Sequence, residues 1–247
     1  MGSPMQRKRS RRMLPMAMLV AAALLFSALG IWQIERRTEK LALIDAVEHR
    51  LRAPPVAAPG PADWPGIARA DAYRAVRARG TFLHDRETLA QAVSGRGPGY
   101  WVLTPLRTEQ GWILLVNRGF VPPEARDRAA RRAGEPLGPV TVTGLLRVTE
   151  PGGAFLRSND PARDLWYSRD VAAIGRARGL APLAPYFIDA GPGPVDGRQP
   201  VGGLTIVSFP NNHLQYALTW FALAALALAG AVRIARGEGA ARWSRKA

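Results

Sequence analysis

Two long apolar runs, one near each end of the chain, dominate its pattern of hydrophobic and polar positions. Residues 13–34 are 22 consecutive positions without a charge, and residues 211–232, directly after Pro210, form a second uncharged run. At about 1.5 Å rise per residue the first run would make a helix of about 33 Å, enough to cross the hydrocarbon core of a bilayer. The pattern therefore predicts transmembrane helices at 13–34 and 211–232, and Asn211 or Asn212 is suited to cap the second.

The alternative for the first run is a cleaved signal peptide. The run exceeds the usual apolar core of about 7–15 residues in such a peptide, and no clear small-residue cleavage site follows it. Instead, a helical pattern of apolar residues continues through Leu41, Ile44, Val47 and Leu51 until Pro54. We therefore expect the first span to be retained and its helix to continue beyond the membrane.

The region between the two spans, residues 35–210, has the pattern of a β-rich domain. After a Pro/Ala/Gly linker at 53–66, short stretches alternate apolar and polar residues as half-buried strands do. The expected strands are 73–82, 101–106, 112–116, 140–146, 185–188 and 204–209, with short helices at 124–132 and 168–178. The fold class expected is a membrane protein in which two transmembrane α-helices flank a mostly antiparallel α+β domain that could close into a barrel.

Charge gives this arrangement an orientation. The chain has 34 Lys and Arg against 19 Asp and Glu, a net charge of +15. Five basic residues lie in the tail 1–12 and five in the tail 233–247, so the positive-inside rule places both tails in the cytoplasm. Arg36, Arg37 and Lys40 oppose this orientation but are outnumbered. The central domain is therefore expected to be periplasmic, in a bacterial inner membrane.

Composition also excludes several classes of function. The chain has no cysteine, so it has no disulfide, iron–sulfur cluster or thiolate metal site. The positive charge alone would suggest a nucleic-acid binder, but ten of the basic residues lie in the tails and the central domain carries only +6. The partner that the tails indicate is the lipid bilayer and not a nucleic acid.

Nothing in the chain makes a positive case for an enzyme. The glycine-rich stretch 95–99 lacks the Lys-Ser/Thr of a phosphate loop and is expected to be a turn. His49, His84 and His213 are too scattered for a metal motif made by local spacing. The candidate acids are Asp160, Asp164, Asp170 and Asp189, and each is expected at the solvated surface.

The unusual residue is His213, a histidine at the mouth of an uncharged span. The simplest interpretation is an interfacial histidine bonded to water, Asn211 or Asn212. However, the chain leaves the membrane near residue 34 and re-enters near residue 213 on the same side. Trp32, Gln33 and Arg36 should therefore lie at the depth of His213.

A haem site is the second interpretation of these residues. Tyr216 and Trp220 follow His213 on the same helical face, and an imidazole beside an aromatic stripe suits a flat apolar cofactor. Haem iron commonly takes a histidine ligand, and Arg36 could pair with a propionate. Met16 and Met18 lie near the cytoplasmic end of their span and are poor candidates for a second ligand. The aromatic residues alone are equally typical of an interfacial belt.

Taken in order, several short motifs resemble the surfeit-locus-one family of cytochrome c oxidase assembly proteins. They are GIWQIER at 30–36, GTF at 80–82, GYWVLTPL at 99–106, VNRGFVP at 116–122, GLLR at 144–147, NDP at 159–161, WY at 166–167, PYF at 185–187 and NNHLQYALTWF at 211–221. Each motif is weak alone, but the ordered set covers most of the chain and is specific. The linker at 53–66 and the Arg-rich stretch 126–132 are not distinctive of the family.

The resemblance implies a non-catalytic factor that binds haem a at the outer membrane interface and assists its insertion into oxidase subunit I. The family histidine corresponds to His213, which would be an axial ligand of the haem iron. Trp32, Gln33, Arg36, Tyr216 and Trp220 would complete the cofactor site, and haem a synthase is a further candidate partner. The alternatives are a scaffold that holds subunit I without haem, and an anchored envelope hydrolase.

Overall fold

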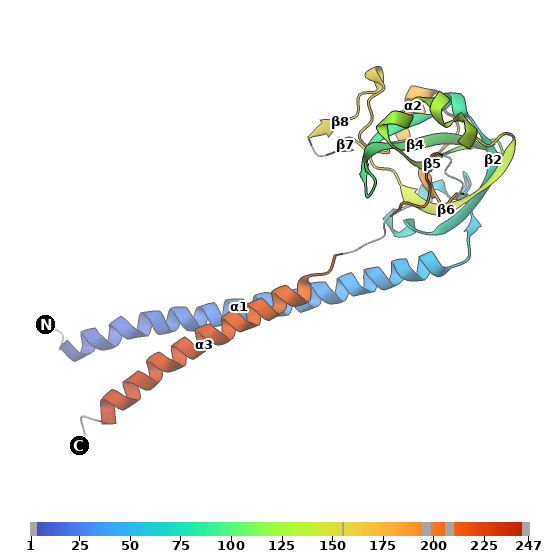
Figure 1. The fold of residues 1–247 in the computed structure, drawn as a ribbon. Coiled ribbons are helices and arrows are strands. Elements are labelled where there is room, and N and C mark those ends of the chain that lie inside the picture. The colour runs from blue at the N-terminus through green and yellow to red at the C-terminus, as the bar shows by residue number, and fades with distance from the viewer. Residues whose placement is uncertain (1–3, 155, 194–198, 206–209, 244–247) are drawn as a thin grey trace. The chain divides into compact units, whose positions relative to one another are not determined.

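A computed structural model describes residues 4–154, 156–193, 199–205 and 210–243 of the chain (Figure 1). It divides into two compact units, which are described separately below. The helical unit contains residues 1–45 and 208–247, and the barrel unit contains residues 46–207. The two apolar runs thus belong to one unit and the predicted β-rich domain to the other.

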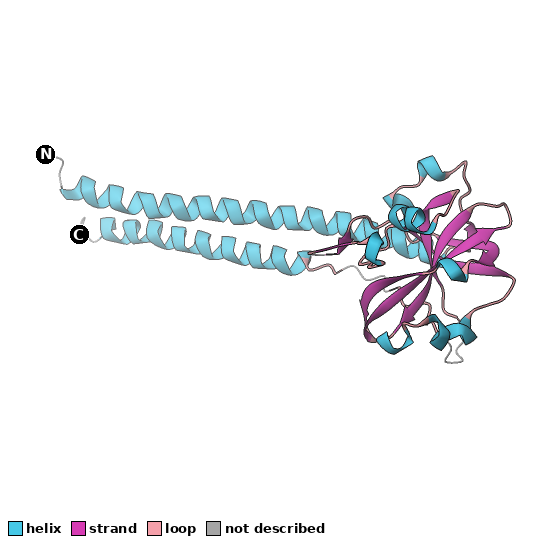
Figure 2. Ribbon diagram, turned by 90° about the horizontal axis from the view of Figure 1, so that it is seen from above, coloured by secondary structure: helices cyan, strands magenta, loops and turns pink. Residues whose placement is uncertain are grey.

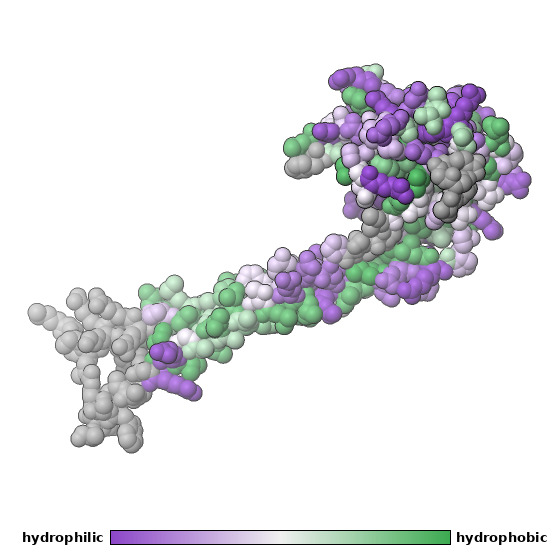
Figure 3. Space-filling view, in the orientation of Figure 1, coloured by the Kyte–Doolittle hydropathy of each residue, from purple (hydrophilic) through white to green (hydrophobic). Residues whose placement is uncertain are grey.

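Two long helices make up most of the helical unit. Helix α1 spans Pro4–Arg52, so the predicted continuation of the first helix as far as Pro54 is confirmed. Helix α3 spans His213–Trp243 and begins directly after Asn212, whose carbonyl accepts a hydrogen bond from the backbone N–H of Tyr216. The stretches Met13–Arg52 and His213–Arg236 are long and apolar enough to cross a membrane, and apolar residues line both helices in Figure 3.

Small residues let α1 and α3 approach closely as an antiparallel pair (Figure 2). Ala23 of α1 and Ala217, Ala224, Ala227 and Ala231 of α3 are buried. A Cβ atom at Gly30 would lie 2.6 Å from the ring of Phe221, so only glycine fits there without moving that ring. One turn away, the rings of Phe26 and Trp220 stack at 5.6 Å. Such small-residue contacts are typical of helices that associate within a bilayer.

Five strands of the barrel unit form a closed barrel. The strands are β2 (Ala75–Phe82), β4 (Gly97–Thr108), β5 (Ile113–Val121), β6 (Pro139–Val148) and β9 (Leu183–Ala190). They follow each other in the order β2-β6-β9-β5-β4, and pairing between β2 and β4 closes the ring. Within it only β5 and β9 run parallel, which confirms the predicted mostly antiparallel barrel.

The remaining elements extend or cover this barrel. Strand β1 (Val56–Ala57) pairs with β2, strand β3 (Thr88–Ser94) pairs with β4, and strands β7 (Gly153–Ala154) and β8 (Arg157–Ser158) form a separate hairpin. The turn between β3 and β4 lies in the glycine-rich stretch, as expected. Helix α2 (Val171–Arg178) begins where the side chain of Asp170 accepts a hydrogen bond from the N–H of Ala173, and it ends at Gly179.

Three expectations about these elements need correction or lie outside the described residues. Strand β3 was not expected, because its sequence TLAQAVS is rich in alanine, which favours strands little. The helix expected at 124–132 is two 3₁₀ segments, Pro123–Ala125 and Arg128–Gly134, separated where Asp127 caps the second one. In the strand expected at 204–209, Leu204 and Thr205 are not in a strand and 206–209 lie outside the described residues.

The barrel core is apolar and also holds the Pro-rich linker in place. Its interior is filled by the buried side chains Val76, Leu106, Leu114, Leu146, Tyr186 and Ile188, and a second cluster including Trp166, Ile174 and Phe187 lies under α2. The hydroxyl of Tyr186 donates to the carbonyl of Pro59 at 2.8 Å, and burial raises the pKa of this tyrosine. Trp64 of the linker contacts Trp112 edge-on. The linker is thus packed on the barrel.

The expectation of a solvated surface position is wrong for Asp189, whose relative exposure is 3%. Its carboxylate accepts hydrogen bonds from Asn117 at 2.7 Å, Arg147 at 2.6 Å, Arg169 at 3.1 Å and Thr205 at 3.0 Å. A buried charge requires this degree of pairing, because removing it from water is costly. We call Asp189, Arg147, Arg169 and Glu150, which binds both arginines, the Asp189 cluster.

Candidate functional site

The structure places His213 directly against Gln33. The Nδ1 atom of the half-buried imidazole lies 2.7 Å from Oε1 of Gln33, although 180 residues separate them in the chain. Gln33 is 9% exposed, in the interface between α1 and α3. This contact agrees with the equal depth expected for Gln33 and His213. The partner of the imidazole is therefore Gln33, rather than the Asn211 or Asn212 of the simpler interpretation.

The hydrogen bond also determines which imidazole nitrogen can act as a ligand. The amide oxygen of Gln33 can only accept, so Nδ1 of His213 donates and carries the proton. In the neutral ring Nε2 then keeps its lone pair, which is the state that a metal-binding histidine needs. A carbonyl or amide partner at the other nitrogen is the usual device that orients such a ligand. Histidine and glutamine together therefore fit the proximal side of a haem.

The other predicted site residues lie on the same two helices as this pair, close to it along the chain. Trp32 and Tyr216 are 50% and 54% exposed, so their apolar rings are available to a ligand or to lipid. Trp220 is half-buried and is engaged by Phe26 through the ring stack described above. Arg36 pairs with Glu39 at 2.7 Å, and both side chains are more than half exposed. A propionate at Arg36 would therefore compete with Glu39.

Asn211, expected from the sequence as a helix cap or as a partner of His213, has a further feature in the structure. Its side-chain oxygen is buried and has no hydrogen-bond partner among the described residues. Buried polar atoms are nearly always paired, so an unpaired one two residues before His213 is consistent with a place for a ligand. The sequence indicated Asn211 only as a cap or as a partner of His213, and not as a ligand-facing residue. Phe26 and Phe221 were missed for a different reason, because they are apolar residues in an apolar run.

The barrel unit has its own histidine and candidate acids, which the structure places separately. Within the residues that the structure describes, no three His, Asp or Glu side chains gather as metal ligands do. His84 instead shares a hydrogen bond with the carbonyl of Pro136 through Nε2. Among the other candidate acids, Asp160 and Asp170 cap helical segments, and Asp164 lies at the surface.

One ion pair of the barrel unit predicts a specific pH dependence. Arg128 donates two hydrogen bonds to Glu135, at 2.6 and 2.9 Å, and these lower the pKa of Glu135. A carboxyl with a lowered folded-state pKa stabilises the fold above its unfolded pKa, and this contribution is lost as the pH falls through the folded value. We expect Arg128→Gln to cost about 0.5–1 kcal/mol at pH 7, since Arg128 is 45% exposed.

The measurement is thermal unfolding of the full-length protein in detergent between about pH 7 and pH 3. The difference between wild type and Arg128→Gln should shrink towards zero at the acidic end. Arg132→Gln, at an exposed arginine of the same segment, is the matched control and should change little at any pH. A difference of equal size at both ends of the range would contradict the role given to Glu135.

Comparison with known proteins connects these features to one family. The model of the SURF1 family matches residues 20–225, which include the whole barrel unit and part of each apolar helix. Surfeit locus protein 1 of Rattus norvegicus is 38% identical over 213 residues, covering 80% of this chain and 68% of the relative. The human protein of that name is 38% identical over 214 residues, covering 80% and 69%. A SURF1-like protein of Monosiga brevicollis is 35% identical over 235 residues, covering 90% and 87%.

The family match and the relatives both extend across most of the chain, and residues 20–225 of the family match include Gln33, His213 and all five strands of the closed barrel. This coverage shows more than a shared domain. The chain belongs to the SURF1 family.

Proposed function

We propose that this protein is an assembly factor for haem–copper cytochrome c oxidase. It holds haem a at the outer interface of the inner membrane and assists its insertion into oxidase subunit I. The observation that carries the proposal is the 2.7 Å contact between His213 and Gln33, which prepares one imidazole nitrogen as a ligand where two apolar helices meet. Membership of the SURF1 family supports the oxidase as the target.

Each residue of the site has a proposed task. His213 supplies the axial nitrogen, and Gln33 keeps the imidazole in the required tautomer and orientation. Trp32, Tyr216 and Trp220 form an apolar, aromatic wall, and Arg36 exchanges Glu39 for a haem propionate. The haem itself supplies the iron and the absorbance by which its binding is followed. No step of this role needs a general acid or base.

The membrane topology follows the charge pattern. The two basic tails lie at the same end of the antiparallel helical pair and remain in the cytoplasm, and the barrel unit lies in the periplasm. The lipid bilayer, subunit I and, during transfer, haem a synthase are the proposed partners.

The test is the optical spectrum of the full-length protein, purified in detergent from cells that produce haem a. A haem a spectrum in stoichiometric amount is expected, together with specific loss of haem a from membranes of a deletion strain that keeps its other cytochromes. If the purified protein carries no haem but still captures subunit I, the result would favour a scaffold that holds subunit I without binding haem. Normal oxidase in the deletion strain would contradict both.

A further inference from the structure

A small hairpin, formed by strands β7 and β8, projects from the barrel unit outside the closed barrel (Figure 1). Ala154 pairs with Arg157, so Leu156 lies in the tight turn between the two strands. Its φ is 60°, a conformation that such turns usually give to glycine, asparagine or aspartate, and its side chain is 88% exposed. Neither the turn nor the barrel core gains from a leucine here. An exposed leucine at a strained position therefore points to a contact outside the barrel unit.

The end of β3 carries a second exposed apolar residue, Val93, which is 84% exposed. Side chains alternate along a strand, so Val93 and Gln91 lie on the same face of β3. Nη1 of Arg157 donates a hydrogen bond to Oε1 of Gln91 at 3.3 Å. This bond joins the β3–β4 hairpin to the β7–β8 hairpin and brings Val93 and Leu156 to one side of the barrel unit. We call Val93, Arg96, Leu156 and Arg157 the hairpin surface.

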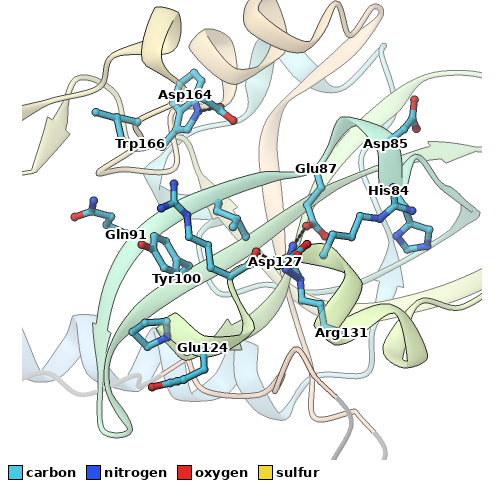
Figure 4. A pocket seen from close by; sticks show the side chains of 15 residues that line it. His84, Asp85, Glu87, Gln91, Tyr100, Glu124, Asp127, Arg131, Asp164 and Trp166 are labelled. Atoms are coloured by element: carbon cyan, nitrogen blue, oxygen red, sulfur yellow. Dashed lines mark hydrogen bonds and ion pairs between the residues drawn. The ribbon is translucent and has the colours of Figure 1, made fainter.

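Charge separates the hairpin surface from the polar cleft beside it. Residues 88–108 and 151–159, which include both hairpins, contain no aspartate or glutamate, and Arg96 and Arg157 are exposed. Gln91 also lines the cleft shown in Figure 4. Five carboxylates line that cleft: Asp85, Glu87, Glu124, Asp127 and Asp164. A surface that combines apolar and basic residues is typical of contact with anionic lipid, which an acidic cleft would repel.

The path of the chain keeps this side of the barrel unit near the bilayer. Thr205 is held by its 3.0 Å hydrogen bond to Asp189, and α3 begins at His213. Even at full extension of about 3.6 Å per residue, Thr205 and His213 lie no more than about 30 Å apart. Glu150, a member of the Asp189 cluster, lies shortly before the start of β7. The chain toward the membrane and the β7–β8 hairpin therefore leave the barrel at the same cluster.

We propose that the hairpin surface rests on the lipid bilayer that α1 and α3 cross. Leu156 and Val93 enter the boundary between headgroups and acyl chains, and Arg96 and Arg157 donate hydrogen bonds to lipid phosphates. Arg157 can do so because its hydrogen bond to Gln91 uses only Nη1. The contact gives the barrel unit a third attachment to the membrane, beside its two chain connections. It rests on the proposed membrane insertion of both helices, and not on haem binding.

The experiment uses the absence of cysteine from the chain to place one fluorescent label at a chosen site. The full-length protein with Leu156→Cys or Val93→Cys is labelled and reconstituted in vesicles of phosphatidylethanolamine and phosphatidylglycerol. Some of the lipids carry a spin label on the acyl chain next to the headgroup, which quenches a fluorophore only on close contact. We expect strong quenching at both positions. Leu137→Cys is the matched control, because Leu137 is 93% exposed but precedes β6, at the end opposite to Glu150.

Two substitutions separate a specific contact from a label that enters the lipid by itself. In the labelled Val93→Cys protein, Leu156→Ser should lower the ratio of quenched to unquenched label about tenfold, since it removes the larger apolar side chain of the contact. Arg96→Gln should lower the same ratio about fivefold, the effect of roughly one basic residue at an anionic surface. Arg107→Gln, at an exposed arginine near the other end of β4, should leave the ratio unchanged.

Quenching at positions 93 and 156 that is no greater than at position 137 overturns the proposal, as does quenching that neither substitution changes. Quenching that appears only when oxidase subunit I is added to the vesicles would assign the surface to a protein partner and also overturn the lipid contact. Flotation of the vesicles is recorded for every sample. Protein that floats without quenching counts against the hairpin surface alone, whereas protein that does not float overturns the proposed membrane insertion as well. None of these measurements needs haem, so a failure of haem binding would leave them unaffected.

Discussion

An Asp189→Ala variant is expected to lose about 3 kcal/mol of the stability of the barrel unit. The substitution removes the carboxylate that joins Arg147 and Arg169, whose side chains are only 16% and 13% exposed. Glu150 still binds both arginines, which keeps the loss at the lower end of the range for a broken buried pair. The amide of Asn117 would lose its acceptor as well. Total stabilities of domains are about 5–15 kcal/mol, so this is a large share.

Thermal unfolding of the full-length protein in detergent, followed by circular dichroism of the β signal, measures this effect. Asp85→Ala is the matched control, because Asp85 is 75% exposed and lies 3.9 Å from Arg86. The control should stay within about 0.5 kcal/mol of wild type. If both alanine variants unfolded at the same temperature, the Asp189 cluster could not be a major source of stability.

A His213→Ala variant is expected to be purified without haem a, at the same yield of protein. The change removes the proposed axial nitrogen, while the packing of Gly30 on Phe221 and the Phe26–Trp220 stack remain. Absorbance spectra of wild type and variant, normalised to protein, measure the result. A variant that keeps an unchanged haem spectrum would remove His213 as the ligand.

A Gln33→Leu variant tests the role of Gln33 in orienting the imidazole separately from the role of His213 as the ligand. Loss of a group that orients a metal ligand typically lowers affinity about 10–100-fold, so this variant should bind haem weakly but with an unaltered spectrum. His84→Ala, in the barrel unit, is the control for a histidine that is not a ligand and should bind as wild type does. Equal loss in Gln33→Leu and His84→Ala would point to general destabilisation.

Much of the architecture could be predicted because it depends on local pattern. The alternation through Tyr73–Phe82 corresponds to β2, and the apolar repeat beyond Ile34 corresponds to the unbroken helix α1. The contact of Gln33 with His213 was predictable for a geometric reason. A chain that leaves and re-enters a bilayer on one side must bring the two crossing points to one depth.

The features that escaped prediction depend on distant parts of the chain. Asp189 lies near the end of strand β9, and only the fold brings Arg147, Arg169 and Asn117 to its carboxylate. A polar cleft on the barrel unit combines β3, β4 and two connecting segments, so residues as far apart as Leu89 and Trp166 line it. Strand β3 itself has weak intrinsic preference and forms because β4 offers it a full register of partners.

The missing side chain at Gly30 has a consequence one helical turn further along α1. Because Phe221 rests against the bare backbone there, the axial offset between the two helices is determined, and that offset sets Gln33 opposite His213. A single added methyl group would displace the ring and slide or separate the helices by a fraction of a turn. The alignment of the His213 imidazole is therefore governed by a residue whose own position lies on neither side of that hydrogen bond.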